Sequence, residues 1–355
     1  MSTSTYYKSI IDRIYFTPEA ENHSAFRNVA EQLGDLPWSC VSSAQDIPEE
    51  FRNQRSLLLQ TVRGEPLTPC PGTRIHQCCN YHTLDAFIGC SLGCSYCIMQ
   101  SYLNFSPLVV QVDPQPAIEA MRRAAAQLPV LRVGTGEVGD SLQLDPLTGL
   151  SAVLIRAAAE LPNVQFEAKT KTDFVQHLLN IESKGRAVIG FSVNPPSVIR
   201  EEEGTAVSLG RRIRAAERAV EAGYRVAFHF DPMIRVPDWE AQYRKLARQL
   251  TAFNPKDVAW ISLGSVRFTP ALRKKMTDRP YLYDEFVPSR DGKLRYLQPI
   301  RVEMYRAVAE EFGSSYPMYL CMESEAVWRR VFGHLPHENP LLHDIFVGRR
   351  QELGV

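Results

Sequence analysis

The sequence predicts an α/β fold, in the form of a partial, incomplete parallel β/α barrel of about six strands. Two observations support this fold class: short apolar segments alternate with longer amphipathic ones after residue 80, and the apolar segments carry polar residues on one face. The segments expected to form strands are 83–89, 131–137, 164–170, 187–194, 225–231 and 258–264.

Amphipathic segments of ten or so residues separate the expected strands. Strands joined through helices of this length pair in parallel by right-handed crossovers, and six such units would curl into a barrel. The segments expected to form helices are 117–128, 151–161, 174–181, 209–222 and 239–253.

Polar residues follow one face of the expected strands, although parallel strands covered on both sides are usually apolar throughout. In the segment 164–170, Gln165, Glu167 and Lys169 share one face, and Ser192 and Asn194 continue the pattern on the next strand. An antiparallel sheet with one face exposed to solvent would also show this alternation, but the intervening helices favour a barrel with a polar lumen. Barrel enzymes assemble their sites at the carboxyl ends of the strands.

The pattern of polar and apolar residues changes near residue 80, which predicts that the chain has three parts. Residues 1–80 are expected to be an N-terminal extension that packs on the barrel, because they are mixed polar segments with Pro and Gly between them. Residues 81–335 form the barrel, with a C-terminal hairpin near 285–300, and residues 336–355 form a C-terminal tail.

Composition places the chain among soluble proteins without a global electrostatic preference. Forty basic and forty acidic residues cancel, so any contact with nucleic acid would have to be local. No apolar segment is long enough to span a membrane, and residues 1–16 lack the apolar centre of a signal peptide. We therefore expect a cytoplasmic protein with no membrane partner, whose eight cysteines serve as thiols instead of disulfides.

Three cysteines stand close together directly after the first expected strand. Cys90, Cys94 and Cys97 are four and then three positions apart, and Gly93 allows the loop to fold back. Three thiolates can hold a metal centre and leave one position free for an outside ligand, which distinguishes a catalytic centre from a closed structural one. The alternative is a structural zinc site with His82, Cys78 or Cys79 as fourth ligand.

A glycine-rich segment, Gly134-Thr135-Gly136-Glu137, ends the second expected strand. Alone it is as typical of a turn as of a ligand site. Its place one crossover after the three-cysteine loop favours a ligand site over a turn.

The cysteine spacing resembles that of the radical S-adenosylmethionine (SAM) superfamily. Its members hold a [4Fe-4S] cluster on three cysteines, the fourth iron binds the amino and carboxylate groups of SAM, and one electron breaks a C–S bond to give a 5'-deoxyadenosyl radical. The resemblance implies that Cys90, Cys94 and Cys97 are the cluster ligands and that Tyr96 lies beside the cofactor.

Further segments resemble the spore photoproduct lyase family, which repairs a methylene-bridged thymine dimer in DNA. The similarity covers roughly residues 80–335, and the segments 70–73, 78–79 and 319–324 resemble a branch that is not confined to spore formers. The segments that carry the family resemblance are 166–170, 191–201, 212–224 and 228–232.

This resemblance implies a set of cofactor contacts and partners. Lys169, Ser192 and Ser141 would bind the carboxylate and sugar of SAM, and Glu137 would accept from its amino group. The implied partners are UV-damaged DNA and an electron donor such as flavodoxin or ferredoxin, while the oligomeric state is left open.

One departure from the family pattern concerns the hydrogen donor. Family members place a cysteine just after the second strand to return a hydrogen atom to the thymine radical, and residues 133–145 contain none. Either Cys321 or Tyr96 closes the radical cycle, or the substrate is a different one. For His229, with Asp231 as its partner, we expect a positioning role over proton donation.

Basic residues near 290 are candidate DNA contacts. The segment 289–296 predicts a hairpin turned at Asp-Gly, and a related hairpin probes the lesion in the lyase family, so Arg290, Lys293 and Arg295 are candidate phosphate contacts. An ordinary solvated turn is the alternative. Arg267, Arg273, Lys274 and Lys275 could extend the basic patch, whereas Arg211, Arg212, Arg214 and Arg218 are expected on a solvated helix face.

Three functional hypotheses therefore stand. The first is a radical SAM lyase that repairs a pyrimidine dimer, and the second is a radical SAM enzyme acting on RNA, a protein or a small molecule. The third is a zinc-containing nucleic-acid-binding protein without catalysis.

Cys70, Cys78 and Cys79 are interpreted as packing thiols, because adjacent residues of an extended chain point to opposite sides.

Overall fold

The computed structural model describes residues 3–62, 64–70, 72, 76–103, 107–276 and 278–347. Pro71, Thr73 and the last eight residues of the predicted C-terminal tail, 348–355, lie outside these ranges. The chain divides into two compact units, which are described separately: Met1–Cys70, His82–Leu92 and Leu103–Ala187 form the first, and Pro71–Tyr81, Gly93–Tyr102 and Val188–Val355 form the second. The three-part division made from the sequence stays a prediction.

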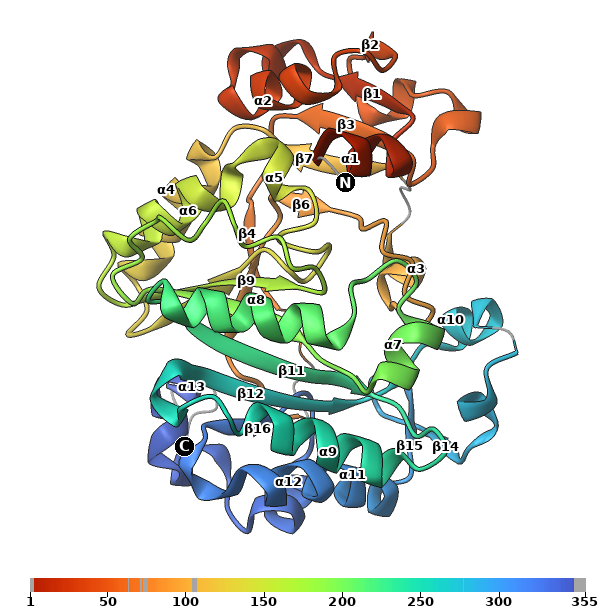
Figure 1. Cartoon of the computed structure of the whole chain (residues 1–355), viewed down its shortest axis with the longest axis vertical. Helices are drawn as coiled ribbons and strands as arrows, with labels where there is room; N and C mark the ends of the chain where they lie inside the picture. The colour runs from red at the N-terminus through yellow and green to blue at the C-terminus, as the bar shows by residue number, and fades with distance from the viewer. Residues whose placement is uncertain are drawn as a thin grey trace. The chain divides into compact units, whose positions relative to one another are not determined.

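A five-stranded sheet that the sequence analysis did not predict occupies the N-terminal part of the first unit (Figure 1). Its strand order is β2-β1-β3-β7-β6, and only β6 is antiparallel to its neighbour. The strands were missed because each has five residues or fewer. Their bounds are β1 Arg13–Phe16, β2 Trp38–Cys40, β3 Ser56–Gln60, β6 Phe87–Ile88 and β7 Leu108–Gln111.

Short helices accompany this sheet. In α2, Ala25, Val29 and Leu33 recur every four residues and are fully buried, which gives the helix one apolar stripe. The helical elements of this part are α1 Thr3–Ile10, η1 Pro18–Asn22, α2 Ser24–Leu33, η2 Ala44–Asp46 and η3 Glu49–Phe51.

The remaining strands of the first unit follow the order β9-β8-β5-β4. β8 and β9 are parallel, and β4 pairs with β5 in the antiparallel sense. The elements are β4 Leu67–Pro69, β5 Tyr81–Leu84, α4 Gln115–Ala125, β8 Leu131–Gly134, α5 Asp145–Thr148, α6 Leu150–Ala159 and β9 Val164–Thr170.

The second unit contains the parallel order β16-β12-β11-β10. α8 packs against β11, and α11 packs against β12 and lies between α9 and α12 (Figure 1). The elements are α3 Met99–Tyr102, β10 Ala187–Ser192, α7 Pro196–Glu202, α8 Leu209–Glu221, β11 Arg225–Met233, α9 Trp239–Leu250, η4 Pro255–Asp257, β12 Val258–Ser265, α11 Gln298–Phe312, η6 Gly313–Ser315, β16 Met318–Leu320, α12 Glu325–Phe332, η7 Pro336–Glu338, η8 Pro340–Leu342 and α13 His343–Phe346.

A small antiparallel sheet, β13-β15-β14, confirms the predicted hairpin. Ser289 N donates to Lys293 O at 2.8 Å, and Gly292 takes a φ of 77°, which favours glycine. The elements around it are β13 Arg267–Phe268, α10 Pro270–Lys275, η5 Pro280–Tyr283, β14 Phe286–Pro288 and β15 Leu294–Tyr296.

Two sequence predictions of secondary structure were wrong. The segment 83–89 is divided between β5 and β6, which belong to different sheets. The segment 174–181 is a series of turns, because Val175, Leu178 and Ile181 recur every three residues and their backbone bonds are of the i→i+3 kind.

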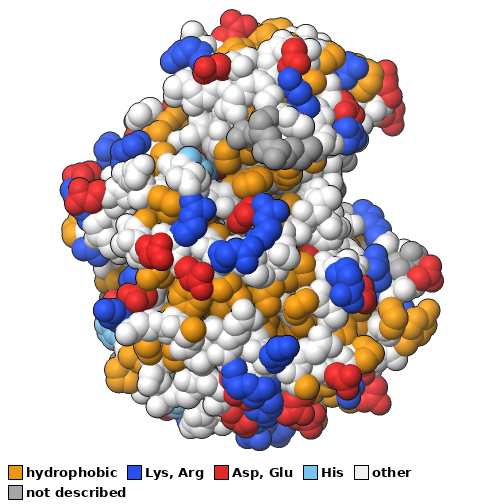
Figure 2. All heavy atoms as spheres, viewed as in Figure 1, with side chains coloured by type: hydrophobic (Ala, Val, Ile, Leu, Met, Phe, Trp, Pro, Cys, Tyr) orange, Lys and Arg blue, Asp and Glu red, His pale blue; other side chains and the backbone are white. Residues whose placement is uncertain are grey.

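Charged side chains are mixed over the surface. On the face drawn in Figure 2, basic and acidic side chains lie next to one another, in agreement with forty residues of each sign. Within the described residues, no helix combines the length and apolarity needed to cross a bilayer. A cytoplasmic location stays a prediction.

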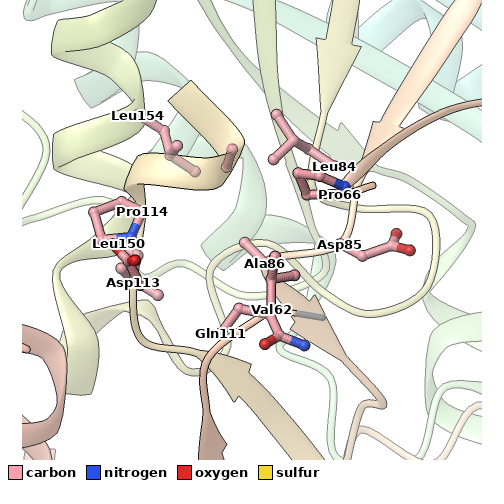
Figure 3. Close-up of a pocket in the computed structure, with 11 residues that line it drawn as sticks. Val62, Pro66, Leu84, Asp85, Ala86, Gln111, Asp113, Pro114, Leu150 and Leu154 are labelled. Atoms are coloured by element: carbon pink, nitrogen blue, oxygen red, sulfur yellow. The ribbon is translucent and has the colours of Figure 1, made fainter. Parts of the chain in front are cut away.

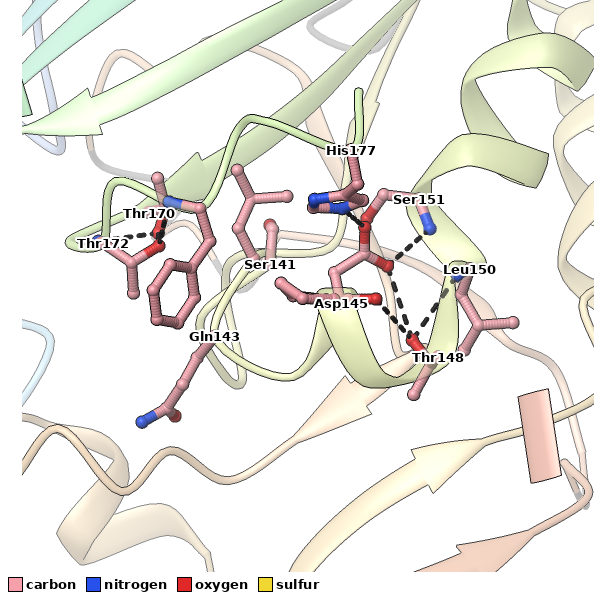
Figure 4. A network of polar contacts seen from close by, with 12 residues as sticks. Ser141, Gln143, Asp145, Thr148, Leu150, Ser151, Thr170, Thr172 and His177 are labelled. Atoms are coloured by element: carbon pink, nitrogen blue, oxygen red, sulfur yellow. Dashed lines mark hydrogen bonds and ion pairs between the residues drawn. The ribbon is translucent and has the colours of Figure 1, made fainter. Parts of the chain in front are cut away.

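A polar network built on Asp145 ties the loop after β9 to the start of α6 (Figure 4). The Asp145 carboxylate is fully buried and accepts from Ser151 N at 2.8 Å, from the Thr148 hydroxyl and from the His177 ring. Since His177 is held by this contact, the turns of 174–181 are fixed by side chains as well as by backbone bonds.

We expect Asp145→Ala to lower the free energy of unfolding by about 2–4 kcal/mol, because it leaves buried donors without an acceptor. Urea denaturation measures the change. Glu160→Ala is the control, since Glu160 is exposed and pairs with the exposed Lys184. Equal midpoints for the two variants would contradict this account of the network.

Candidate active site

The three-cysteine loop crosses from the first unit to the second. Cys90 belongs to the first unit, and Cys94 and Cys97 belong to the second. Among the described residues none of the three forms a disulfide; Cys94 is buried and the other two are half-buried. Gly93 takes a φ of 74°, and Cys97 N donates to Cys94 O at 3.2 Å, so the loop reverses between the cysteines.

The donor set fits an iron–sulfur cluster with one open iron. Three thiols within eight residues are the ligands that such clusters take, and each binds a different iron atom. Throughout the described part of the chain, no three His, Cys, Asp or Glu side chains surround one point as the ligands of a single metal ion do. A cluster does not require three side chains around one point, because its cysteines bind different iron atoms.

Gln143 anchors the start of the loop in the first unit. Its side-chain amide donates to the Ser91 hydroxyl at 2.6 Å, and its side-chain oxygen accepts from Ser91 N at 3.1 Å. Its backbone oxygen accepts from the Tyr7 hydroxyl at 2.7 Å. Gln143 was missed by the sequence analysis, because a single Gln in a polar loop gives no signal.

Asp140 stands in the segment where the family pattern has a cysteine, and its carboxylate is saturated. It accepts from Leu142 N and Gln143 N at 3.0 Å, and from the Thr170 hydroxyl and Lys171 N at 2.7 Å. A buried carboxylate with four donors is a structural anchor for the loop that carries Gln143.

The predicted SAM contacts of the first unit lie around Gly136. Ser141 Oγ accepts from Lys169 N at 3.0 Å and from the Thr135 hydroxyl at 2.8 Å, and Lys169 Nζ lies 3.5 Å from the Glu137 carboxylate. A Cβ at Gly136 would approach Lys169 Cβ to 2.7 Å. The structure therefore brings Glu137, Ser141 and Lys169 together, and it needs glycine where they meet.

Two consecutive glutamates anchor the loop in the second unit. Ser95 N donates to Glu202 O at 2.8 Å, and the Ser95 hydroxyl also contacts the Glu202 carboxylate. The Tyr96 hydroxyl donates to Glu203 Oε1 at 2.6 Å. Burial, followed by the Glu203 charge, raises the pKa of Tyr96 well above its usual value.

Ser192 lies at the end of β10, and a buried arginine holds its backbone. Arg212 Nη1 donates to Ser192 O at 2.9 Å, and Arg212 Nη2 lies 2.5 Å from Glu203 Oε2. The prediction that Arg212 lies on a solvated helix face was wrong. Glu203 supplies the opposite charge, and this partner lies nine residues away in a run of three glutamates that reads as exposed.

Asp231, near the carboxyl end of β11, and Cys321, directly after β16, both lie close to Arg267. Arg267 donates to both oxygens of Asp231 at 3.0 and 3.1 Å, and Arg267 Nη2 lies 3.5 Å from Cys321 Sγ. Cys321 is half-buried and follows β16 directly. His229 is buried on β11, where its predicted positioning role stays a prediction.

The three hairpin residues have different surroundings. Arg290 is exposed. Arg295 is buried and donates to both oxygens of Asp291 at 2.5 and 2.7 Å, and Lys293 Nζ lies 3.9 Å from the same carboxylate. Burial, together with the charge of Arg267, lowers the pKa of Lys293. Of the three, only Arg290 is therefore open to a phosphate in this conformation.

An apolar pocket in the first unit contains no predicted site residue (Figure 3). It has a volume of about 300 Å³ including its open mouth. Asp85 and Gln111 line it, and one side-chain oxygen of each has no hydrogen-bond partner among the described residues. Burial raises the pKa of Asp85, and the charge of Glu137 adds to the effect.

The remaining cysteines differ in exposure, and none of them forms a disulfide within the described part of the chain. Cys70, Cys78 and Cys79 are half-buried, and Cys40 is exposed. Their interpretation as packing thiols stays a prediction.

A family model and curated relatives agree on one family. The family model described as spore photoproduct lyase matches residues 77–282. The chain is 26% identical over 290 residues to the spore photoproduct lyase of Geobacillus sp. (strain Y412MC61), which covers 75% of this chain and 81% of the relative. It is 29% identical over 262 residues to that of Bacillus subtilis (strain 168), which covers 69% and 74%.

Solved structures give the same result for the fold. A spore photoproduct lyase variant with bound AdoMet and dinucleoside spore photoproduct superimposes with a TM-score of 0.75 at 20% identity. The match covers 88% of this chain and 98% of the other. The fold class predicted from the sequence, a partial parallel β/α barrel, is confirmed.

We expect Gly136→Ala to lower the free energy of unfolding by about 1–3 kcal/mol, because the new methyl group meets Lys169 Cβ and Lys169 O as well as Ser141 Oγ. Urea denaturation measures the loss. Gly210→Ala is the control: its methyl group would lie 3.5 Å from the end of the Arg214 side chain, and alanine favours the helix. The account is wrong if Gly136→Ala is as stable as the control.

Proposed function

The chain belongs to the spore photoproduct lyase family, and from this membership we propose that it cleaves SAM reductively and repairs a UV-damaged pyrimidine dimer in DNA. The observation that carries the proposal is the loop of Cys90, Cys94 and Cys97, which lies inside the matched range 77–282. Separate anchors in the two units hold this loop: Gln143 in the first, Glu202 and Glu203 in the second.

Different residues would hold the cluster and bind SAM. Cys90, Cys94 and Cys97 would hold the [4Fe-4S] cluster. With SAM bound, the reduced cluster would supply one electron, which would break a C–S bond of SAM and leave methionine and a carbon-centred radical. Glu137, Lys169 and Ser141 lie around Gly136 and offer a carboxylate, an ammonium group and a hydroxyl, which suit a ligand that carries both an amino group and a carboxylate. Ser192 and the ring of Tyr96 would complete the SAM site in the second unit.

Cys321 and Tyr96 are the two candidates for the hydrogen donor. The Tyr96 hydroxyl is committed to Glu203, whereas Cys321 is half-buried at the end of a parallel strand. Cys321 is thus the better placed of the two to return a hydrogen atom, with His229 in a positioning role. An electron donor such as flavodoxin or ferredoxin would supply the reducing electron.

A second candidate function keeps the cofactors and changes the substrate. It is favoured by one observation: residues 133–145 contain no cysteine, and Asp140, which stands there, is fully occupied by four donors. RNA, a protein or a small molecule would then replace DNA. A third candidate, a zinc protein without catalysis, is separated from both by its metal content.

The first test is metal and product analysis of the reduced protein. After anaerobic reconstitution we expect about four iron and four sulfide ions per chain, and none in the triple variant Cys90→Ala/Cys94→Ala/Cys97→Ala. Cys40→Ala, at an exposed thiol, is the control. With SAM and irradiated DNA, the wild type should form 5'-deoxyadenosine and lose the dimer.

The outcomes of this test separate the three candidates. 5'-Deoxyadenosine without change to the DNA would retain the cofactor chemistry and reject repair. Stoichiometric zinc without iron would reject both enzymatic functions.

DNA contact is proposed for the exposed part of the segment 267–295. The segment has eight Lys or Arg against four Asp or Glu in a chain that is neutral overall. Tyr283 is 79% exposed and offers a ring on which a base could stack, and Lys274 and Lys275 are exposed on α10. Arg290 extends this basic and aromatic surface at the hairpin turn.

We expect Arg290→Ala to weaken binding to irradiated DNA and to reduce the slope of log Kd against log salt by about one, because one phosphate contact is lost. Binding is measured by fluorescence anisotropy between about 50 and 200 mM salt. Arg200→Ala is the matched control, since Arg200 is exposed on α7 and pairs with Glu201. An unchanged slope in Arg290→Ala would remove the hairpin from the DNA-binding surface.

A further inference from the structure

The carboxylate of Glu203 is the centre of a buried network in the second unit. Glu203 follows α7 directly and is fully buried. Its Oε1 accepts from the Tyr96 hydroxyl at 2.6 Å and from Asn194 Nδ2 at 2.9 Å, and its Oε2 lies 2.5 Å from Arg212 Nη2. One carboxylate therefore contacts three segments: the three-cysteine loop (called the cluster loop below), the residues that follow β10, and α8.

Arg212 extends the network to the strand end. Its Nη1 donates to Ser192 O and its Nε donates to Val207 O, each at 2.9 Å. Asn194 is held in turn, because its side-chain oxygen accepts from the Tyr243 hydroxyl at 2.8 Å. From Tyr96 to Ser192 the chain of contacts runs through only two side chains, Glu203 and Arg212.

Burial of this ion pair is costly, so its presence requires a reason beyond stability. Two charges removed from water gain little net energy from each other, and an apolar pair of the same volume is often as stable. A charged pair, however, accepts only one arrangement of donors and acceptors. It suits a position where the orientation of a loop matters more than the strength of packing.

We propose that Glu203 and Arg212 are positioning residues that hold the Tyr96 side of the cluster loop at a fixed place relative to the strand end that carries Ser192. The inference rests on the proposed function, in which Cys94 and Cys97 bind the cluster and Ser192 contacts SAM. Glu202 supports the same arrangement through Ser95, so two adjacent loop residues are fixed by two adjacent residues of one helix end.

Two variants change this network by different amounts. Glu203→Gln removes the charge opposite Arg212, and Tyr96→Phe removes one hydroxyl while it keeps the ring beside the cofactor. Both variants should displace the loop. Because displacement of a site by about one ångström is costly, we expect each variant to bind SAM at least about tenfold more weakly than the wild type. The SAM-induced change in the electron paramagnetic resonance spectrum of the reduced cluster should also be reduced in both variants.

A second buried ion pair of the same unit provides the matched control. Arg301 Nε donates to Glu323 Oε1 at 2.7 Å, and the Tyr305 hydroxyl donates to the same atom at 2.8 Å. Glu323→Gln thus breaks an equivalent arrangement of Arg, Glu and Tyr that does not include the cluster loop. It should lose thermal stability to a similar extent as Glu203→Gln and keep wild-type SAM affinity and spectrum.

The measurements separate this inference from the proposed function. A wild-type protein that takes up no iron and sulfide overturns both. A wild type that holds the cluster, with variants at Glu203 and Tyr96 that match its SAM affinity and spectrum, overturns the positioning role alone. If Glu203→Gln does not fold, Tyr96→Phe decides the question, since it leaves the ion pair intact.

Discussion

The carboxylate of Glu203 is the constraint on which the second half of the cluster loop depends. A buried carboxylate must find donors on each oxygen, and here the donors come from three separate elements: Tyr96, Asn194 and Arg212. Arg212 balances the charge, while Tyr96 and Asn194 donate to Oε1, so displacement of any of the three would leave a buried carboxylate oxygen without one of its donors. The three-cysteine loop, the segment after β10 and α8 are therefore joined through one carboxylate. The contact with Tyr96 holds the part of the loop that lies between Cys94 and Cys97.

The first unit meets a similar need with neutral groups. Gln143 holds Ser91 through both atoms of its amide, and Asp140 holds the loop that carries Gln143. An amide that donates and accepts at once also specifies one orientation, at a smaller desolvation cost than an ion pair. The loop around Cys90 is thereby specified with one buried carboxylate, Asp140, whose charge is balanced by backbone and hydroxyl donors.

Periodicity predicted the long elements and failed for the short ones. β9 lies where the sequence placed it, and α8 differs by one residue, because strict alternation or 3.6-residue spacing over seven or more residues is unambiguous. β1 and β2, with four and three residues, lack a detectable period. Spacing directed attention to the three-cysteine loop and to the glycine-rich segment, but it gave no signal for Gln143 and Glu203, since their contacts depend on partners that only the fold brings near.

Arg212 shows why such residues are missed and what this implies for the site. Its helix, α8, has a strong amphipathic pattern, and a single arginine on the buried face does not by itself indicate a role. In the structure that arginine binds a strand carbonyl and a carboxylate at once, which is the use to which a planar guanidinium with five donors is best suited. A lysine there could not bridge both acceptors in one plane. Residues that break a pattern are therefore the ones to examine when a loop must be held in register with a binding strand.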